Sequence, residues 1–261
     1  TRRGLPSNRF SSRMSATSTS NGPFHLVICP GAWCQVAQWQ GFVEAMNRSP
    51  LDLSGITLVQ WPNGEEAVGL SGHVDAVLSA VPVGTGPLVM LGHSFGTFPL
   101  LEASAVLGER VRGVVLVDGF LPVHGLSAFA QSEGRRGPVS MRAAAVSCAV
   151  PPPDSMIWGL RDALATSVIS SMQTHSLSSL EESISAEAAA VVEHLPMKAY
   201  LGASAHTGEA NPFKRAFASL EGRRDWFSVQ ISGGHLLHVE RPVALAYWTA
   251  QFLRMVAGKG F

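Results

Sequence analysis

The segment Gly92-His93-Ser94-Phe95-Gly96 constrains the fold of this chain more than any other stretch of its sequence. It has the pattern Gly-x-Ser-x-Gly and lies between an apolar run of strand length, residues 87–91, and an apolar run with helical spacing, residues 98–107. Glycines on both sides of the serine allow a sharp backbone turn and a close approach of strand and helix. The pattern therefore predicts a strand–turn–helix elbow with Ser94 at its tip.

The same alternation of strand and helix recurs along most of the chain. Apolar runs predict strands at 24–29, 56–61, 87–91, 111–117, 198–202 and 226–231, and helical spacing predicts helices at 36–47, 71–80, 98–107, 212–220 and 242–256. Continuous apolar strands separated by amphipathic helices predict an α/β fold, a mostly parallel sheet flanked by helices. Ligands bind such sheets at the carboxyl ends of the strands, where Pro30, Ser94 and Asp118 follow their runs.

The alternation stops between about residues 120 and 196. This stretch contains Pro151-Pro152-Pro153 and helical patches at 157–171 and 187–194. We expect a helical insertion that forms a lid over the strand ends, within a single domain of residues 24–261.

Composition narrows the classes of partner. Hydrophobic residues make up 46% of the 261 residues and the formal net charge is +0, so the basic surface that nucleic acids and anionic membranes require is not expected. No apolar run approaches the roughly 18 residues of a transmembrane helix, which predicts a soluble protein. The three cysteines lack metal-type spacing and the glycines match no nucleotide-binding fingerprint, so neither a metal nor a cofactor is expected.

Residues 1–23 differ from the rest of the chain. They are rich in arginine, serine and threonine, and the first carboxylate of the sequence is Glu44. This composition is typical of organelle transit peptides and favours a chloroplast over a mitochondrion. The alternative is an arm or tail on a cytoplasmic protein, which a protein partner would order.

A serine at such an elbow becomes a nucleophile when a base removes its proton. His235 follows the last predicted strand, in the order nucleophile then histidine that this kind of site uses, and Gly233 and Gly234 precede it. His238 is the rival base and is expected to be structural, whereas His93 is expected to brace the elbow. Developing negative charge on a substrate oxygen needs N–H donors, for which we predict the backbone of Phe95 and Ala32.

The chain resembles the α/β-hydrolase superfamily, in the branch of plant methylesterases, hydroxynitrile lyases and related bacterial esterases. The resemblance rests on residues 30–34 (PGAWC), 92–96 (GHSFG), 116–122 (LVDGFLP) and 233–242 (GGHLLHVERP). It implies a cofactor-independent esterase. Where the family usually has histidine this chain has Pro30, which implies altered bracing of the oxyanion loop. Hydroxynitrile lyases generally carry a lysine near the catalytic histidine, and none lies between Lys214 and Lys259.

The acid that orients His235 is less clear from the resemblance. Most family members have an aspartate after the strand that corresponds to residues 198–202, and here that loop has Glu209 but no aspartate. Some bacterial relatives instead have an aspartate in a Val-Asp-x-Phe-x-Pro segment, where this chain has Asp118. We therefore predict Asp118 as the acid, with Glu209 and a triad without a working acid as alternatives.

Together these features predict a serine hydrolase that cleaves a small to medium uncharged ester. Four side chains are candidates to line an apolar pocket: Trp33, Phe129, Met156 and Trp158. The alternative from another class is a catalytically silent protein of this fold, which serves as a binding protein or as a subunit. The missing aspartate, Pro30 and the N-terminal arm favour that alternative.

Overall fold

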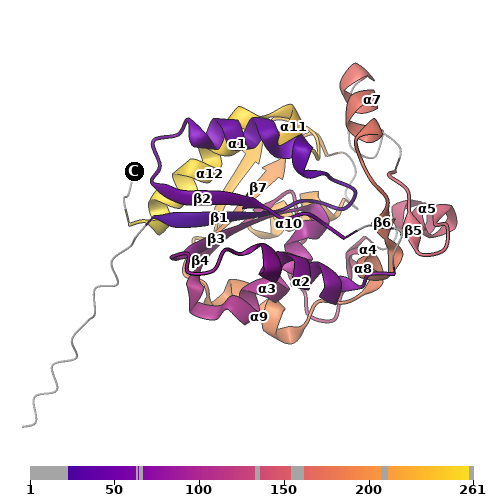
Figure 1. The fold of residues 1–261 in the computed structure, drawn as a ribbon, viewed down its shortest axis with the longest axis horizontal. Coiled ribbons are helices and arrows are strands. Elements are labelled where there is room, and N and C mark those ends of the chain that lie inside the picture. The colour runs from indigo at the N-terminus through magenta and orange to yellow at the C-terminus, as the bar shows by residue number, and fades with distance from the viewer. Residues whose placement is uncertain are drawn as a thin grey trace, which may run out of the picture.

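The computed structural model describes residues 23–62, 64, 67–132, 136–153, 162–206 and 211–258. Apart from Pro23, the predicted targeting segment lies outside these residues. A six-stranded parallel sheet occupies the centre of the molecule in the order β2-β1-β3-β4-β7-β8 (Figure 1). Its strands are β1 (Phe24–Cys29), β2 (Leu53–Leu58), β3 (Leu88–His93), β4 (Val111–Val117), β7 (Lys198–Ala203) and β8 (Phe227–Ile231).

Helices cover both faces of the sheet, as the sequence predicts. One face carries α1 (Gln40–Asn47), α11 (Leu237–Glu240) and α12 (Pro242–Val256), and the other carries α2 (Leu70–Ala80), α3 (Thr97–Leu107) and α9 (Ala186–His194) (Figure 1). Helix α10 (Pro212–Ser219) packs on β7, and short 3-10 turns are η1 (Val36–Trp39), η2 (Ser94–Gly96) and η3 (Gly108–Arg110). Within the described ranges, no helix combines the length and the apolar character needed to cross a membrane.

Burial on both faces explains why the strands read as unbroken apolar runs. Successive residues of a strand point to opposite faces. In β1, Leu26 and Ile28 pack in the core under α1 and α12, whereas Val27 and Cys29 pack in the core under α2 and α3. All four are fully buried.

One strand boundary predicted from the sequence is wrong. We expected a strand over residues 56–61, but β2 spans Leu53–Leu58. β2 is an edge strand that pairs only with β1 and is half-buried, so its apolar content is diluted. The chain leaves the sheet before Trp61, whose indole instead donates a hydrogen bond to the carbonyl of Pro30 at 3.1 Å.

The segment between β4 and β7 differs partly from the expected helical insertion. It contains α4 (Ala128–Gln131), α5 (Arg136–Ala144), α7 (Asp162–Ser170) and α8 (Leu177–Glu181), which lie beyond one end of the sheet (Figure 1). It also contains an antiparallel pair, β5 (Ala149–Val150) and β6 (His175–Ser176), which are too short to leave a pattern in the sequence. Helix α9 packs against α3 in the core, so we restrict the term insertion to residues 120–185.

Hydrogen bonds attach the insertion to the loops around the sheet. The Trp33 indole donates to the carbonyl of Val150 at 2.9 Å, and the carbonyl of Trp33 accepts from the backbone N–H of Gln173 at 3.2 Å. The carboxylate of Glu182 accepts from the Leu70 N–H at the start of α2, at 2.6 Å. That the insertion acts as a lid stays a prediction.

The elbow depends on the two glycines that flank Ser94. A Cβ at Gly96 would lie 2.2 Å from the carbonyl oxygen of Pro30 and 2.4 Å from that of Cys29. A Cβ at Gly92 would lie 2.9 Å from the Leu100 side chain and 3.0 Å from the backbone of Thr97. Gly96 therefore permits a backbone approach that any side chain would prevent, and Gly92 permits a tight approach of β3 and α3.

Replacing Gly96 with alanine is expected to lower the free energy of unfolding by at least about 2 kcal/mol, because the obstacle is backbone and cannot rotate away. Urea denaturation measures the loss. The matched control is Gly41→Ala, at an exposed helical position where the nearest atom lies 3.4 Å from the new Cβ. Alanine favours helices, so this control should be neutral or stabilising. Equal effects of the two substitutions would contradict the steric account.

Candidate active site

Ser94 lies where β3 ends and the turn into α3 begins. Its backbone has φ 53°, in the left-handed region, as do Trp33 at φ 64° and Asp118 at φ 40°. Non-glycine residues adopt this conformation rarely, and such strain tends to collect at functional sites. These three residues follow β1, β3 and β4 at the carboxyl end of the sheet; the fourth such residue of the described ranges, Ser147 at φ 57°, lies in the segment between β4 and β7.

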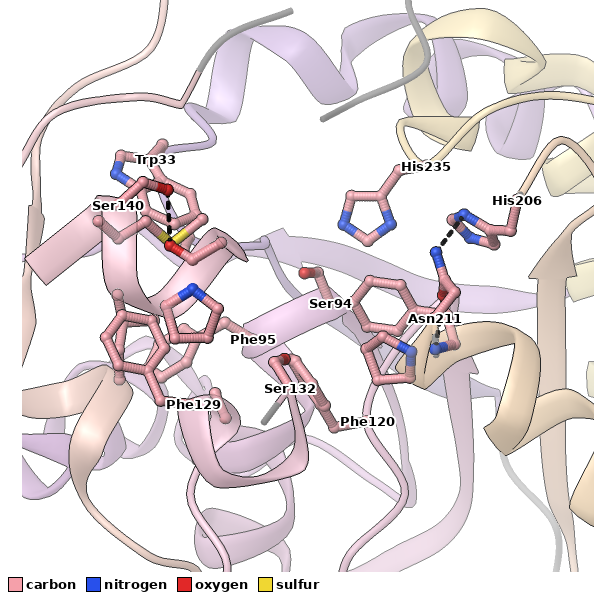
Figure 2. Close-up of a pocket in the computed structure, with 18 residues that line it drawn as sticks. Trp33, Ser94, Phe95, Phe120, Phe129, Ser132, Ser140, His206, Asn211 and His235 are labelled. Carbon is pink, nitrogen blue, oxygen red and sulfur yellow. Dashed lines mark hydrogen bonds between the residues drawn. The ribbon is translucent and has the colours of Figure 1, made fainter. Parts of the chain in front are cut away.

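His235 and Ser94 line the same pocket. Figure 2 shows the His235 imidazole beside the Ser94 hydroxyl, with both side chains facing the open centre of the cavity. His235 belongs to the loop after β8 and is 4% exposed. Its ring stacks on that of Phe213, with centroids 4.5 Å apart and an interplanar angle of 20°. The structure thus brings the predicted nucleophile and the predicted base together.

Asp118 lies behind His235, fully buried. Its Oδ2 accepts a hydrogen bond from Nδ1 of His235 at 2.6 Å, and its Oδ1 accepts from the backbone N–H of Ala203 at 2.9 Å. Burial alone would raise the pKa of Asp118, but hydrogen bonds from His206 and His235 outweigh it and lower the pKa to about 2. The carboxylate is therefore ionised and holds a proton on Nδ1 of His235. In the neutral ring Nε2 then carries no proton, as a base requires.

Glu209, the alternative acid, lies outside the described residues, and its role stays a prediction. The sequence analysis missed a different residue of the same loop, His206. Its Nε2 lies 2.5 Å from Oδ2 of Asp118. The sequence gives one indication of this residue, because His206 lies in the loop after residues 198–202, where the resemblance places the acid.

The two predicted oxyanion donors border the pocket on the Ser94 side. Phe95 follows Ser94 in the turn, and Ala32 lies in the loop after β1. This loop approaches Ser94 closely, because a Cβ on Gly31 would lie 3.2 Å from the Cβ of Ser94. Trp61 braces the loop with its indole N–H, which lies 3.1 Å from the Pro30 carbonyl and 3.3 Å from that of Gly31. The loop after β1 is therefore held in place by Trp61, although it has Pro30 where the family usually has histidine.

The two histidines that the sequence predicts to be structural near the elbow, His93 and His238, have structural contacts. His93 donates from Nε2 to the backbone carbonyl of His235 at 2.9 Å, which ties the elbow to the loop of the base. Burial, and then the proximity of His235, lower the pKa of His93 to about 3. His238 stacks on Trp39 at 4.2 Å, and burial lowers its pKa well below the ordinary range. Both rings are therefore neutral, and His238 faces the core.

The pocket has a volume of about 290 Å³ and is mainly apolar. Its walls include both described candidates, Trp33 and Phe129; Met156 and Trp158 lie outside the described residues. The remaining large side chains come from the turn after Ser94, the insertion and α10: Phe95, Phe120, Met141, Leu180 and Phe213. None of the described lining residues is Asp, Glu, Lys or Arg.

One group of side chains at the site has ligand atoms close enough to suggest a metal centre. The atoms of Asp118, His206 and His235 lie within 4.8 Å of one another. However, the amide nitrogen of Asn211 lies 3.1 Å from Nδ1 of His206 and donates to it, so the proton of the neutral ring is on Nε2. A metal-binding nitrogen must be unprotonated. The donors of this cluster therefore fit a hydrogen-bond network and do not fit a metal.

Solved structures with the same architecture exist, although their sequences are distant. An extracellular α/β-hydrolase from a Paenibacillus species, described as sharing homology with tobacco salicylic acid binding protein 2, superposes with a TM-score of 0.71 at 18% identity, over 87% of this chain and 98% of that one. The chain has the α/β-hydrolase fold.

Two other α/β-hydrolase-fold matches are more distant still. A pyrethroid hydrolase from Sphingobium faniae gives a TM-score of 0.61 at 14% identity, over 88% of this chain and 96% of that one. A variant of tomato methylketone synthase I with bound β-ketoheptanoate gives 0.62 at 13% identity, over 90% and 99%. No protein-family model and no curated protein matches the sequence. The specific branch inferred from the motifs therefore stays a prediction.

The buried neutral histidines make stability depend on pH. The pKa of His93 falls from 6.5 to about 3 on folding, and those of His175 and His238 also fall. Their contribution is complete above pH 6.5 and is lost as the pH falls toward 3, because the unfolded chain then binds protons that the folded chain excludes. Each histidine contributes up to about 1.4 kcal/mol per pH unit. Urea denaturation between pH 7.5 and pH 4.5 should show a steadily falling free energy of unfolding.

His238→Phe is the matched variant for this prediction. Phenylalanine retains the stacking on Trp39 and has no proton to bind, and neither ring nitrogen of His238 has a hydrogen-bond partner among the described residues. The variant should therefore lose stability less steeply as the pH falls. Parallel curves for variant and wild type would show that His238 is not the cause.

Proposed function

We propose that this α/β-hydrolase-fold chain is a serine hydrolase that cleaves carboxylic esters through an acyl-enzyme. One observation carries the proposal: Ser94 shares a pocket with His235, whose Nδ1 lies 2.6 Å from the buried carboxylate of Asp118. Nucleophile, base and orienting acid are the three parts that acyl transfer by serine requires.

The chemical steps follow from this arrangement. Oγ of Ser94 attacks the ester carbonyl while Nε2 of His235 accepts the hydroxyl proton. The oxyanion that forms is stabilised by the N–H groups of Phe95 and Ala32. The C–O bond to the alcohol then breaks as His235 returns the proton to the leaving oxygen, which leaves an acyl group on Ser94. Water, activated by His235, adds to this acyl group in the same way and releases the acid.

The substrate we propose is a small to medium uncharged ester. A cavity of about 290 Å³ whose described lining residues carry no carboxylate, ammonium or guanidinium offers no partner to a charged group. Aromatic rings from the elbow, the insertion and α10 favour an apolar acyl or alcohol group. The ester-cleaving class has support from fold neighbours, which include carboxylesterases of a thaumarchaeon and a pyrethroid hydrolase.

The silent alternative has lost part of its basis. It depended on a missing acid, a disturbed oxyanion loop and the N-terminal arm. Asp118 is hydrogen-bonded to His235, and Trp61 braces the loop at Pro30. The arm lies outside the described residues, so a chloroplast location, and a partner that orders the arm, remain proposals from composition alone.

Labelling with a fluorophosphonate probe tests the proposed function. The wild-type protein should be modified at Ser94, and His235→Ala should abolish the labelling because the hydroxyl keeps its proton. Asp118→Asn should lower kcat for p-nitrophenyl acetate about 10⁴-fold, since an amide no longer fixes the tautomer of His235. His124→Ala, at an exposed histidine, is the control and should retain full activity. A folded protein that neither labels nor hydrolyses the ester would favour the silent alternative.

The bracing of the oxyanion loop yields a separate prediction. Trp61→Phe removes the indole N–H that reaches the carbonyls of Pro30 and Gly31. The loop should then hold its donor less well, and kcat should fall roughly 10-fold with little change in KM. Trp248→Phe, in α12 and away from the pocket, is the matched control. If both tryptophan variants hydrolyse the ester equally well, the bracing role is wrong.

A further inference from the structure

Asp118 has a second imidazole on the oxygen that orients His235. Nε2 of His206 lies 2.5 Å from Oδ2 of Asp118, the atom that also accepts from Nδ1 of His235. His206 follows β7, and its side chain is 11% exposed. The two rings have centroids 6.0 Å apart and approach one carboxylate oxygen from different loops.

Asn211 fixes which nitrogen of His206 carries the proton. Asn211 is the N-cap of α10, and its Oδ1 accepts hydrogen bonds from the backbone N–H groups of Phe213 at 2.9 Å and Lys214 at 3.1 Å. Because the amide oxygen serves the helix, the amide nitrogen faces His206 and lies 3.1 Å from Nδ1 (Figure 2). An amide nitrogen only donates, so Nδ1 accepts. The proton of the neutral ring is therefore on Nε2, directed at Asp118.

The carboxylate of Asp118 thus accepts hydrogen bonds from three donors. Ala203 N–H binds Oδ1, and the two imidazoles bind Oδ2. A buried carboxylate that had only His235 as a side-chain partner would be free to rotate and would attract the proton of His235 more strongly. The third donor restricts that rotation and withdraws charge from the shared oxygen.

We infer that His206 is a positioning residue of the active site, which orients Asp118 through Nε2 and weakens the hold of its carboxylate on the proton of His235. The inference rests on the proposed function, because it concerns the base of that reaction. Neither nitrogen of His206 is left for a substrate, since one binds Asp118 and the other Asn211. The nitrogens of His206 therefore act on the reaction through Asp118.

The same contacts connect the acid to the wall of the pocket. Phe213, the second residue of α10, stacks on His235 and lies 5.6 Å from the ring of His206, centroid to centroid. The cap of α10, the tautomer of His206 and the orientation of Asp118 consequently depend on one another. The first turn of α10, which forms part of the pocket wall, is therefore connected through these contacts to the carboxylate of Asp118, which orients His235.

Two substitutions of His206 separate this role from simple packing. His206→Met removes the donor and retains bulk, whereas His206→Gln places an amide N–H near the position of Nε2. Without this donor, the carboxylate of Asp118 holds the proton of His235 more strongly. The acid limb of the pH profile of kcat/KM, in which the rate rises as His235 loses its proton, should therefore move to higher pH by about half a pH unit. We expect kcat of His206→Met to fall roughly 10-fold at unchanged KM, and His206→Gln to recover most of both effects. Fluorophosphonate titration normalises each rate to the active fraction.

A second variant covers the case in which His206→Met does not fold. Asn211→Ser retains a good N-cap for α10 but removes the donor to Nδ1 of His206, so it should move the acid limb in the same direction by a smaller amount. In wild-type protein, ¹⁵N NMR of the histidine side chains should show His206 protonated at Nε2, whether or not the protein is active.

The outcomes distinguish the inference from the proposed function. A wild type that neither labels nor hydrolyses esters overturns the proposed function, and the positioning role with it. An active wild type whose His206→Met and Asn211→Ser variants retain the acid limb of the wild type overturns the inference alone. It is also overturned if His206→Gln behaves like His206→Met, or if NMR places the proton on Nδ1.

Discussion

The rest of the site depends on the hydrogen bonds that the ionised carboxylate of Asp118 accepts. A fully buried charge is costly unless donors surround it, and here a backbone N–H from β7 and two imidazoles do so. These donors come from the end of β7, the loop after β7 and the loop after β8, whereas Asp118 follows β4, so the folded sheet must form before the charge is stabilised. In turn the charge fixes His235, and His235 receives a second constraint from His93 at the elbow. The proposed catalytic residues and the packing of the strand ends therefore form one network.

The second constraint on the site is the close approach of the backbone after β3 to the end of β1. This approach explains in steric terms why the elbow motif contains glycine. The turn after β3 passes so near the end of β1 that only a glycine fits at position 96. This contact brings the oxyanion loop against Ser94, where Gly31 in turn leaves room for the His93 ring. The positive φ of Ser94 is held in place by the same packing. Strain at the nucleophile is thus maintained by the fit between two neighbouring parallel strands and the helix that follows.

The sequence predicts most of the fold because both faces of the sheet are buried. Apolar runs alone locate five of the six strands closely, and the final helix has the bounds expected from Pro242. The prediction fails where burial is incomplete, as at the edge strand Leu53–Leu58, or where an element is only two residues long, as in β5 and β6. At the site, motif and chain order predict Ser94 and His235, the resemblance predicts Asp118, and the structure places the three close together; His206 was not predicted. Its role depends on a contact between the loops after β4 and β7, which no local pattern records.

The arrangement also explains how the proposed acid can follow β4 when the loop after β7 lacks an aspartate. β4 and β7 are hydrogen-bonded neighbours in a parallel sheet, with Val117 paired to Leu201, so their following loops start at the same edge. A carboxylate on either loop can reach a histidine that comes from the loop after β8. When Asp118, after β4, supplies the negative charge, β7 and the loop after it must instead offer hydrogen-bond donors to that charge. Ala203 at the end of β7 and His206 in the following loop are such donors, so this loop, which has no aspartate, contributes a hydrogen bond to the proposed acid.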